Sequence, residues 1–471
     1  MKNLILSLLL FIPYSLGAAP MKFDDPFFFG VANAANQVED GLHDTWLDWA
    51  NENKGRAFNN FPVPNERLQF WTKPEVEIDL AAETGIQVFR MGLEWERIMP
   101  APGKFDEVAI KRYSEILKMI KKKNMKVMLT LWHHAVPRWI EQKGGWTNDE
   151  TQKHFFEFSK RAIKEFNSDV EWWLTFNEGN IFTTLAYSIG MWPPGEKRSP
   201  LSMAAVGPFR GDVVKSIDRM ADSHIEIYKW AHKEFPQIKM GFAHNMAYYT
   251  GKSWIDRVKS SFVDAYMNWR FPERVRGFMD FFGFNYYGAE WLKGTQIDVD
   301  PEEEYSEAGR AVHPEGFYQV IKEIDNRFKG MPIIITENGM SDSLDIIKDA
   351  YLIEHLKVIN KVRSEGIKVL GYVVWTLTDN FEWSDGYCPK FGMVAVDRAN
   401  GLKRIKRESF FTFQKIVKSK EITQEMQDIA WKKVVDHQGK DRPFCRAADG
   451  ISALDVPVMR PFAKKDWRFK R

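Results

Sequence analysis

The sequence predicts a single (β/α)8 barrel, a TIM barrel of the α/β class, with long loops after its strands and a C-terminal extension. Eight short runs of apolar, β-branched or aromatic residues alternate with charged segments of helical periodicity. This alternation is typical of a parallel barrel, whose strands are buried on both faces, and favours it over a doubly wound sheet. Several of the runs also end on polar residues. We see no Pro/Gly/Ser linker and no internal repeat that would mark a second domain.

The strand candidates follow one another along most of the chain. Helical segments such as 109–125 and 153–166 lie between them. The long intervals at 39–87 and 181–237 predict extended loops, and loops after barrel strands are where such proteins build specificity. The eight runs are residues 27–38, 88–95, 126–136, 171–180, 238–247, 280–288, 331–340 and 369–383.

The two ends of the chain differ from its middle. Residues 1–19 hold one Lys, a short apolar stretch and then small residues, which predicts a secretory signal peptide and an exported protein, periplasmic or secreted. An uncleaved anchor is the alternative. We expect the barrel at residues 20–418 and an extension at 419–471 that packs on it. The basic, aromatic end PFAKKDWRFKR (461–471) either contacts an anionic membrane surface or belongs to a helix and strap on the barrel.

Composition excludes some function classes and favours others. Lys and Arg number 66 against 64 Asp and Glu, so no net field favours nucleic acid. The 18 Trp and 35 Phe exceed what a core needs, and aromatic faces are common platforms for sugars. Cys388 and Cys445 are the two cysteines; an oxidising compartment allows them to pair, but the sequence does not show whether they meet.

Two strand candidates end in the same way, on polar residues around a single Glu. These are TFNEGN, with Glu178, and IIITENG, with Glu337. In a barrel the carboxyl ends of the strands converge on one face, so these side chains are expected to share a pocket. Other polar or aromatic residues at or near run ends join them: Gln37, Arg90, Glu94, His133, His134, Asn285, Tyr287, Glu382 and Trp383.

Two carboxyl groups across a sugar-sized pocket are what cleavage of a glycosidic bond requires. Arg90 or Tyr287 would keep one Glu ionised, while burial without a cation would raise the pKa of the other and keep it protonated. His133 and His134 are adjacent on a predicted strand, so they should point to opposite faces and make poor co-ligands. We therefore expect no metal and no cofactor. On spacing alone, Trp375 and Trp383 fit the core as well as a sugar platform.

The chain also resembles a known family in a series of motifs. FFFGVANAANQVED, FRMGLEWERI, LTLWHH, TFNEGN, DFFGFNYYG, ITENG, WTLTDNFEWSDGY and KFGMVAVD resemble glycoside hydrolase family 1, the β-glucosidase and β-galactosidase group, in order and to about residue 418. The resemblance implies a retaining mechanism with Glu178 as acid/base and Glu337 as nucleophile. It also implies roles in binding the sugar or supporting the nucleophile for Gln37, His133, Asn177, Trp375, Glu382, Trp383, Arg90, Asn285 and Tyr287.

Departures from the family pattern concern substrate preference more than activity. Gly179 stands where Pro is usual, His134 and Ala135 where Trp-Asp is usual, and Asp40 ends QVED. Within the family, several stretches resemble the plant sensitive-to-freezing branch of galactolipid galactosyltransferases, as does the tail beyond the barrel. These stretches are QVEDGLHDTWLDWA, ERLQFW, KVMLTLWHH, EYSEAGRAVHPEGFY and DGYCPKFGMVAVDR. The expected function is hydrolysis of terminal β-D-glucosyl or galactosyl residues. The alternatives are galactosyl transfer between galactolipids, with peripheral membrane contact, and an inactive sugar-binding protein, which the presence of both Glu residues disfavours.

Overall fold

The computed structural model describes residues 19–52, 65–196, 211–294, 296–446 and 453–471. The predicted signal peptide lies outside these residues except for its last position, so the expectation of export stays a prediction.

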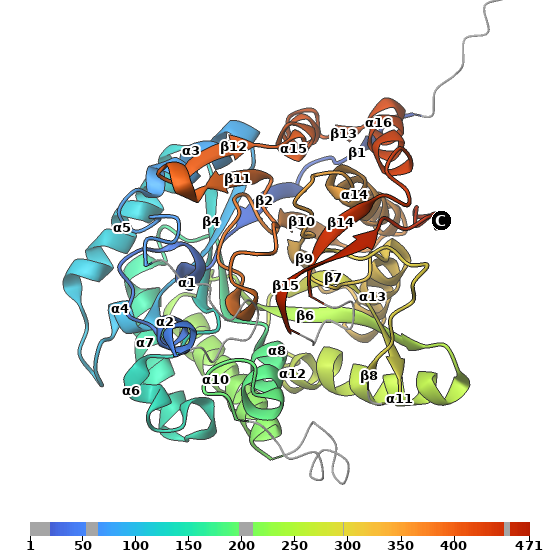
Figure 1. Ribbon diagram of the computed structural model, residues 1–471. Helices are drawn as coiled ribbons and strands as arrows, with labels where there is room; N and C mark the ends of the chain where they lie inside the picture. The colour runs from blue at the N-terminus through green and yellow to red at the C-terminus, as the bar shows by residue number, and fades with distance from the viewer. Residues whose placement is uncertain (1–18, 53–64, 197–210, 295, 447–452) are drawn as a thin grey trace, which may run out of the picture.

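Eight parallel strands close into a barrel, which confirms the predicted fold class (Figure 1). Each strand lies within one of the eight predicted runs or begins in it, and the pairing of β6 with β7 completes the ring. Six further pairings follow chain order, and the seventh joins β10 to β2. The strands are β2 (Phe28–Ala32), β3 (Val88–Gly92), β4 (Lys126–Trp132), β5 (Trp172–Asn177), β6 (Met240–Gly251), β7 (Phe282–Lys293), β9 (Ile333–Asn338) and β10 (Val369–Val374).

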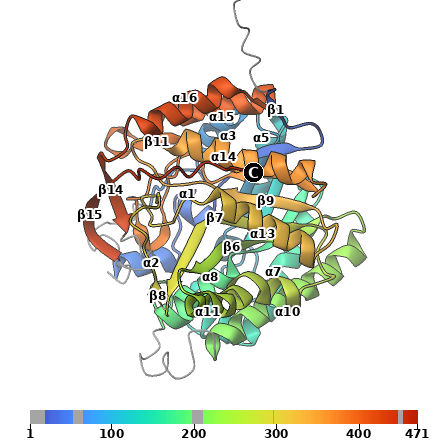
Figure 2. The same ribbon diagram turned by 90° about the vertical axis from the view of Figure 1, so that its right-hand side faces the viewer.

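The strands are apolar because both of their faces are covered. Every residue of β2, β3, β5 and β9 is buried, as expected where side chains fill the barrel on one face and meet helices on the other. The covering helices form an outer layer (Figures 1 and 2). They are α3 (Pro74–Thr84), α5 (Glu107–Lys122), α7 (Glu150–Phe166), α10 (Asp212–Glu234), α13 (Pro314–Arg327), α14 (Lys348–Ser364) and α15 (Glu408–Ser419).

The predicted helical segments 109–125 and 153–166 correspond to α5 and α7. Helix α5 begins two residues early because the Asp106 carboxylate accepts hydrogen bonds from the backbone of Val108 and Ala109. Its apolar positions recur every three or four residues and face the barrel, as an amphipathic helix requires. The buried residues of α5 are Ala109, Ile110, Tyr113, Ile116, Leu117 and Ile120.

Short elements occupy the loops around the barrel. The predicted long intervals contain α2, α3 and α10, together with residues outside the described part of the chain. Further short elements are α1 (Ala35–Val38), α2 (Thr45–Asn51), α4 (Trp95–Ile98), α6 (Arg138–Glu141), α8 (Gly179–Thr184), α11 (Trp254–Asp264), α12 (Arg270–Arg274), β8 (Gln296–Ile297), β11 (Val394–Asp397) and β12 (Lys403–Lys406). Helical turns occur at η1 (Gly145–Thr147), η2 (Leu185–Ile189), η3 (Ala265–Trp269), η4 (Trp383–Asp385) and η5 (Arg398–Asn400).

The C-terminal segment lies against the barrel helices as a helix followed by a strap. Strand β13 (Glu421–Ile422) pairs with β1 (Met21–Lys22), α16 (Gln424–Val435) packs near α14, and β14 (Asp441–Arg446) forms a hairpin with β15 (Ala453–Pro461) (Figure 2). The domain boundary at residue 418 stays a prediction. In the described part of the chain, no helix is both long and apolar enough to cross a bilayer.

The aromatic side chains of the basic end face the protein. Phe462, Trp467 and Phe469 are buried, and the Trp467 ring lies 4.5 Å from that of Trp431. The C-terminal Arg471 pairs with Glu315 on α13 at 2.8 Å. Residues 461–471 therefore lie on the barrel as an extended strap. In this arrangement Phe462, Trp467 and Phe469 are buried and do not face a membrane.

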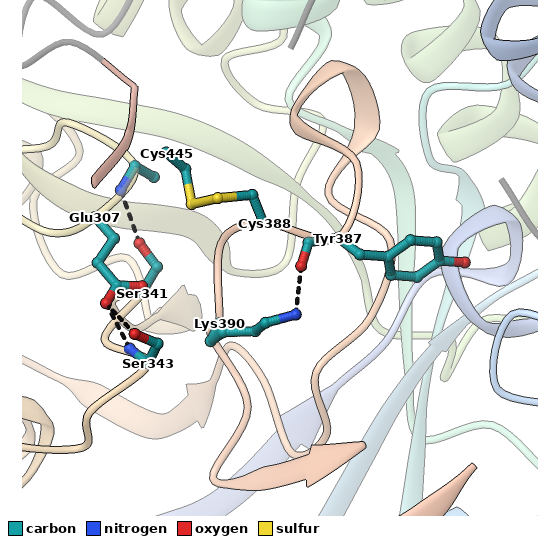
Figure 3. Close-up of a disulfide and its surroundings, with 8 residues drawn as sticks. Glu307, Ser341, Ser343, Tyr387, Cys388, Lys390 and Cys445 are labelled. Atoms are coloured by element: carbon teal, nitrogen blue, oxygen red, sulfur yellow. Dashed lines mark hydrogen bonds between the residues drawn. A yellow bond between two sulfur atoms is a disulfide. The ribbon is translucent and has the colours of Figure 1, made fainter. Parts of the chain in front are cut away.

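A disulfide answers the question that the sequence left open about the two cysteines. Cys388, in the loop after β10, is bonded to Cys445 of β14 (Figure 3). The backbone N–H of Cys445 also donates to the carbonyl oxygen of Glu307 at 2.8 Å, and the Glu307 carboxylate accepts from Ser343. The hairpin is thus fixed to two loops that follow barrel strands, the loop after β10 and the loop that contains Glu307.

We expect this disulfide to stabilise the folded protein mainly through the unfolded chain. The bonded residues are 57 apart in sequence, and closing a loop of that length contributes about 4 kcal/mol in the chain-entropy model. Urea unfolding of a Cys388→Ser/Cys445→Ser variant should show a lower midpoint than the oxidised protein. Reductant should shift the midpoint of the wild type and leave that of the variant unchanged. Equal midpoints for the two oxidised samples would contradict the prediction.

Candidate active site

The polar strand ends converge on one cavity of about 800 Å³. Three of the predicted site residues, Gln37, Arg90 and Asn285, do not line it; Arg90 and Asn285 contact residues that do. Glu94 does not line the cavity either; its carboxylate accepts a hydrogen bond from the backbone N–H of Glu96 and caps α4. The predicted residues that line the cavity are His133, Asn177, Glu178, Tyr287, Glu337, Trp375, Glu382 and Trp383.

Glu337, on β9, is held by one cation and one hydroxyl. The guanidinium of Arg90 donates to Glu337 Oε1, and Tyr287 Oη donates to Oε2 at 2.5 Å. Burial raises the pKa of Glu337, while the Arg90 charge and the hydrogen bonds of Tyr287 and Arg90 oppose the rise. Both oxygens are therefore fixed by groups that favour the ionised carboxylate.

Arg90 also connects Glu337 to the neighbouring strands. Its side chain is fully buried on β3, with Nη1 donating to the carbonyl oxygen of Thr336 at 3.0 Å and Nη2 to Asn177 Oδ1 at 2.7 Å. Asn285 Nδ2 donates to the same Asn177 oxygen at 3.0 Å and to Glu178 Oε1 at 2.7 Å. A continuous chain of hydrogen bonds thus joins the two carboxyl groups.

Glu178 follows the last residue of β5, and its neighbours differ from those of Glu337. Its backbone is left-handed, with φ 46°, which turns the side chain from the strand into the cavity. Oε1 accepts from two neutral amides, Asn285 and Asn245, the latter at 3.0 Å. Burial, and then the negative charge of Glu337, raises the pKa of Glu178 to about 7. This group suits an acid that is protonated at neutral pH.

The expectation for the two histidines was wrong. His133 and His134 both line the cavity, with ring centroids 4.7 Å apart. Strand β4 ends at Trp132, and His134 has φ 72°, so the alternation of a strand does not extend to it. Burial lowers the pKa of both rings well below the usual value, so both are neutral. Among the described residues, no group of three or more His, Cys, Asp or Glu side chains could hold a metal ion.

Several buried polar atoms around the cavity have no protein partner. Asn177 Nδ2 donates to His133 Nε2 at 2.9 Å, which places the proton of the neutral ring on Nδ1. That Nδ1 atom, His134 Nδ1 and Gln37 Oε1 are buried without a hydrogen bond from any described residue. An unpaired buried polar atom is costly, and the hydroxyls of a sugar offer both donors and acceptors.

Trp375, Glu382 and Trp383 line the cavity next to the histidines. Trp375 Nε1 donates to Glu382 Oε1 at 3.3 Å, and the Trp383 ring lies 5.0 Å from that of His134. Burial raises the pKa of Glu382 well above its usual value. The spacing of Trp375 and Trp383 in the sequence left open whether they belong to the core or to a binding site. Both rings line the cavity.

Sequence reasoning missed two residues beside Glu178. Asn245 lies near the end of the run 238–247, so a search for polar residues near run ends would have found it. Arg310 lines the cavity from the loop after β8 and pairs with Glu290. Arg310 ends no predicted strand, and the stretch EYSEAGRAVHPEGFY that contains it carries the resemblance to the galactosyltransferase branch without implying a role for this residue. The departure at Gly179 has a packing cause, because a Cβ there would lie 2.9 Å from Met220 Sδ on α10.

Comparison with known proteins agrees with the fold. The model of glycosyl hydrolase family 1 matches residues 19–422. The chain belongs to glycosyl hydrolase family 1, and it is an O-glycosyl hydrolase by that membership.

Its relatives carry two kinds of name. The galactolipid galactosyltransferase SFR2 of Arabidopsis thaliana is 36% identical over 94% of this chain and 82% of its own length. A β-glucosidase-like SFR2 of Oryza sativa subsp. japonica is 37% identical over 88% of this chain, which spans 66% of the rice protein. Among solved structures, the β-glycosidase from Pyrococcus horikoshii superposes with a TM-score of 0.78 at 27% identity and covers 88% of this chain and 98% of its own.

The pKa of Glu178 predicts how activity depends on pH. Because the leaving group needs a proton, kcat/KM should fall as the pH rises through about 7, the pKa of Glu178. The Asn245 hydrogen bond lowers that pKa, so Asn245→Ala should move the alkaline limb to higher pH. Initial rates on an alkyl β-glucoside, whose leaving group needs the proton, across a pH series check both points. An alkaline limb that stays in place in the variant would contradict the assignment.

Proposed function

We propose that the protein cleaves terminal β-D-glucosyl or β-D-galactosyl residues with retention of configuration, through a covalent intermediate. The observation that carries the proposal is the unlike surroundings of two carboxyl groups in one cavity. Glu337 is fixed by Arg90 and Tyr287, whereas the hydrogen bonds to Glu178 come from the neutral amides of Asn245 and Asn285. Such a pair separates a carboxylate nucleophile from a protonated acid.

The proposed reaction has two steps. The Glu337 carboxylate forms a bond to the anomeric carbon as the bond to the leaving oxygen breaks, and Glu178 gives its proton to that oxygen. Glu178 then removes a proton from water, whose oxygen attacks the anomeric carbon and releases Glu337. His133, Gln37, Glu382 and Trp383 are proposed to hold the sugar hydroxyls, with Trp375 beside the ring.

Removal of the acid should have an effect that depends on the leaving group. Glu178→Ala should slow cleavage of an alkyl β-glycoside by about 10²–10⁴-fold, the usual contribution of general acid catalysis. An aryl glycoside with a strongly acidic phenol needs little protonation, so its first step should slow far less. Azide, which needs no base, should restore its turnover and give a glycosyl azide. Equal losses on both substrates would show that Glu178 is not the acid.

A second candidate function is transfer of a galactosyl group to another galactolipid. The relation to a galactolipid galactosyltransferase, 36% identical over 94% of this chain, supports it. Chemically it differs only in the second step, where a sugar hydroxyl replaces water as the acceptor.

Product analysis separates the two functions. The mature protein would be incubated with monogalactosyl diacylglycerol and, in parallel, with aryl β-glucoside and β-galactoside. Oligogalactosyl lipid is the expected product of a transferase, and free sugar alone would reject transfer. A Glu337→Gln protein serves as the blank for contaminating activity.

Export is proposed from the N-terminal pattern and is supported by the disulfide, since such bonds persist in oxidising compartments. The mass of protein recovered outside the cytoplasm should correspond to a chain that begins near residue 20. An unprocessed chain in the cytoplasm would reject the proposal.

A further inference from the structure

Helix α11 presents an apolar stripe to solvent. Trp254, Ile255, Val258 and Phe262 have exposed fractions of 70%, 48%, 49% and 71%. At about 100° per residue these four side chains fall within an arc of about 100° on the helix. Ser260 is the only buried residue among the eleven of this helix. Since apolar surface favours removal from water, a continuous exposed stripe of this kind indicates a binding surface.

The face of α11 that meets the protein is polar. Asp256, Ser260 and Asp264 lie roughly opposite the stripe. Asp264 accepts hydrogen bonds from Asn268 at 2.6 Å and Trp269 at 2.9 Å, and Asp256 accepts from the backbone N–H of Gly294 at 2.9 Å. This arrangement is the reverse of α5, whose apolar residues face the barrel. Val263 is the apolar exception on this inner side, since it packs against the core; otherwise the fold holds α11 by polar contacts and leaves the stripe exposed.

Two exposed cations border the stripe. Arg257 lies on one side and Lys259 on the other, and Trp254 begins the helix. A helix with Trp and Phe on one face and cations at the borders of that face has the pattern of a helix that lies in the head-group region of a bilayer. The cations complement anionic head groups, so the stripe matches a lipid surface better than a purely apolar protein groove.

The position of α11 relates it to the cavity. Asn245, which contacts Glu178, and Gly251, which ends the same strand, are six residues apart. At about 3.3 Å per residue, β6 extends about 20 Å beyond Asn245. Helix α11 begins just after this extension, on the side of the barrel where the carboxyl ends of the strands lie, and at the periphery of the molecule (Figure 1).

We propose that α11 is a membrane-docking helix, which binds a lipid bilayer through Trp254, Ile255, Val258 and Phe262 with Arg257 and Lys259 on anionic head groups. Docking through α11 places the bilayer on the side of the barrel that carries the site. The proposal concerns an interaction surface and does not rest on which glycosyl reaction the site performs. Its test therefore measures binding and not turnover.

Flotation of the mature protein with vesicles tests the proposal. The vesicles contain phosphatidylcholine with added phosphatidylglycerol. Trp254→Ser/Phe262→Ser should reduce the partition coefficient by about tenfold or more, because two large apolar side chains no longer enter the interface. Arg257→Gln/Lys259→Gln should weaken binding only when the anionic lipid is present, and salt should remove that difference.

Matched controls distinguish binding through α11 from nonspecific adsorption of exposed apolar side chains elsewhere on the protein. Phe411 and Ile429 are exposed to 51% and 61% on α15 and α16, and a Phe411→Ser/Ile429→Ser variant should bind vesicles like the wild type. Turnover of a soluble aryl glycoside should be unchanged in all three variants, which separates docking from the catalytic proposal. Wild-type binding by the α11 serine variant, or an equal loss in the control, would overturn the proposal. A dimer that the α11 variant converts to a monomer would also overturn it, since the stripe would then be covered by a second copy.

Discussion

A guanidinium buried at the centre of the barrel organises the site. Arg90 contacts Glu337 on β9, Asn177 on β5 and the hydroxyl of Thr130 on β4, and its side chain has no exposed surface. A buried cation requires a carboxylate partner, and removal of one partner of such a pair costs about 3–5 kcal/mol. The adjacent strands β3, β4 and β5 are thereby tied to β9, which pairs with none of them, and Glu337 is the group that balances the charge.

The difference between the two carboxyl groups follows from this pair. Arg90 is paired with one carboxylate, that of Glu337. The hydrogen bonds that lead from Arg90 to Glu178 run through the neutral amides of Asn177 and Asn285. Glu178 is therefore buried next to a negative charge without a cation in direct contact, which is why its pKa rises to about 7. One buried Arg in the barrel thus gives unlike surroundings to two carboxyl groups that the sequence presents in matching contexts.

The sequence predicted the barrel well because the strands are largely apolar on both faces and many of the site residues lie at or near the carboxyl ends of strands. The same rule placed Glu178 and Glu337 together. The strand-end rule failed at His134, where the backbone no longer has strand geometry. It also failed at Arg310, which lies in a loop far from any strand end predicted from the sequence. The pairing of Cys388 with Cys445 depends on the loop after β10 meeting strand β14 in space, for which periodicity holds no signal. The inverted polarity of α11 became visible only once its inner face was known.

Trapping the covalent intermediate tests the roles of the two carboxyl groups most directly. A 2-deoxy-2-fluoro β-glycoside with a good leaving group should form the glycosyl-enzyme and release it slowly, because the fluorine destabilises the oxocarbenium-like transition state. Digestion and mass spectrometry should then place one sugar on the peptide that contains Glu337, and none in a Glu337→Gln protein. A sugar on Glu178, or hydrolysis with inversion and no labelled peptide, would contradict the account.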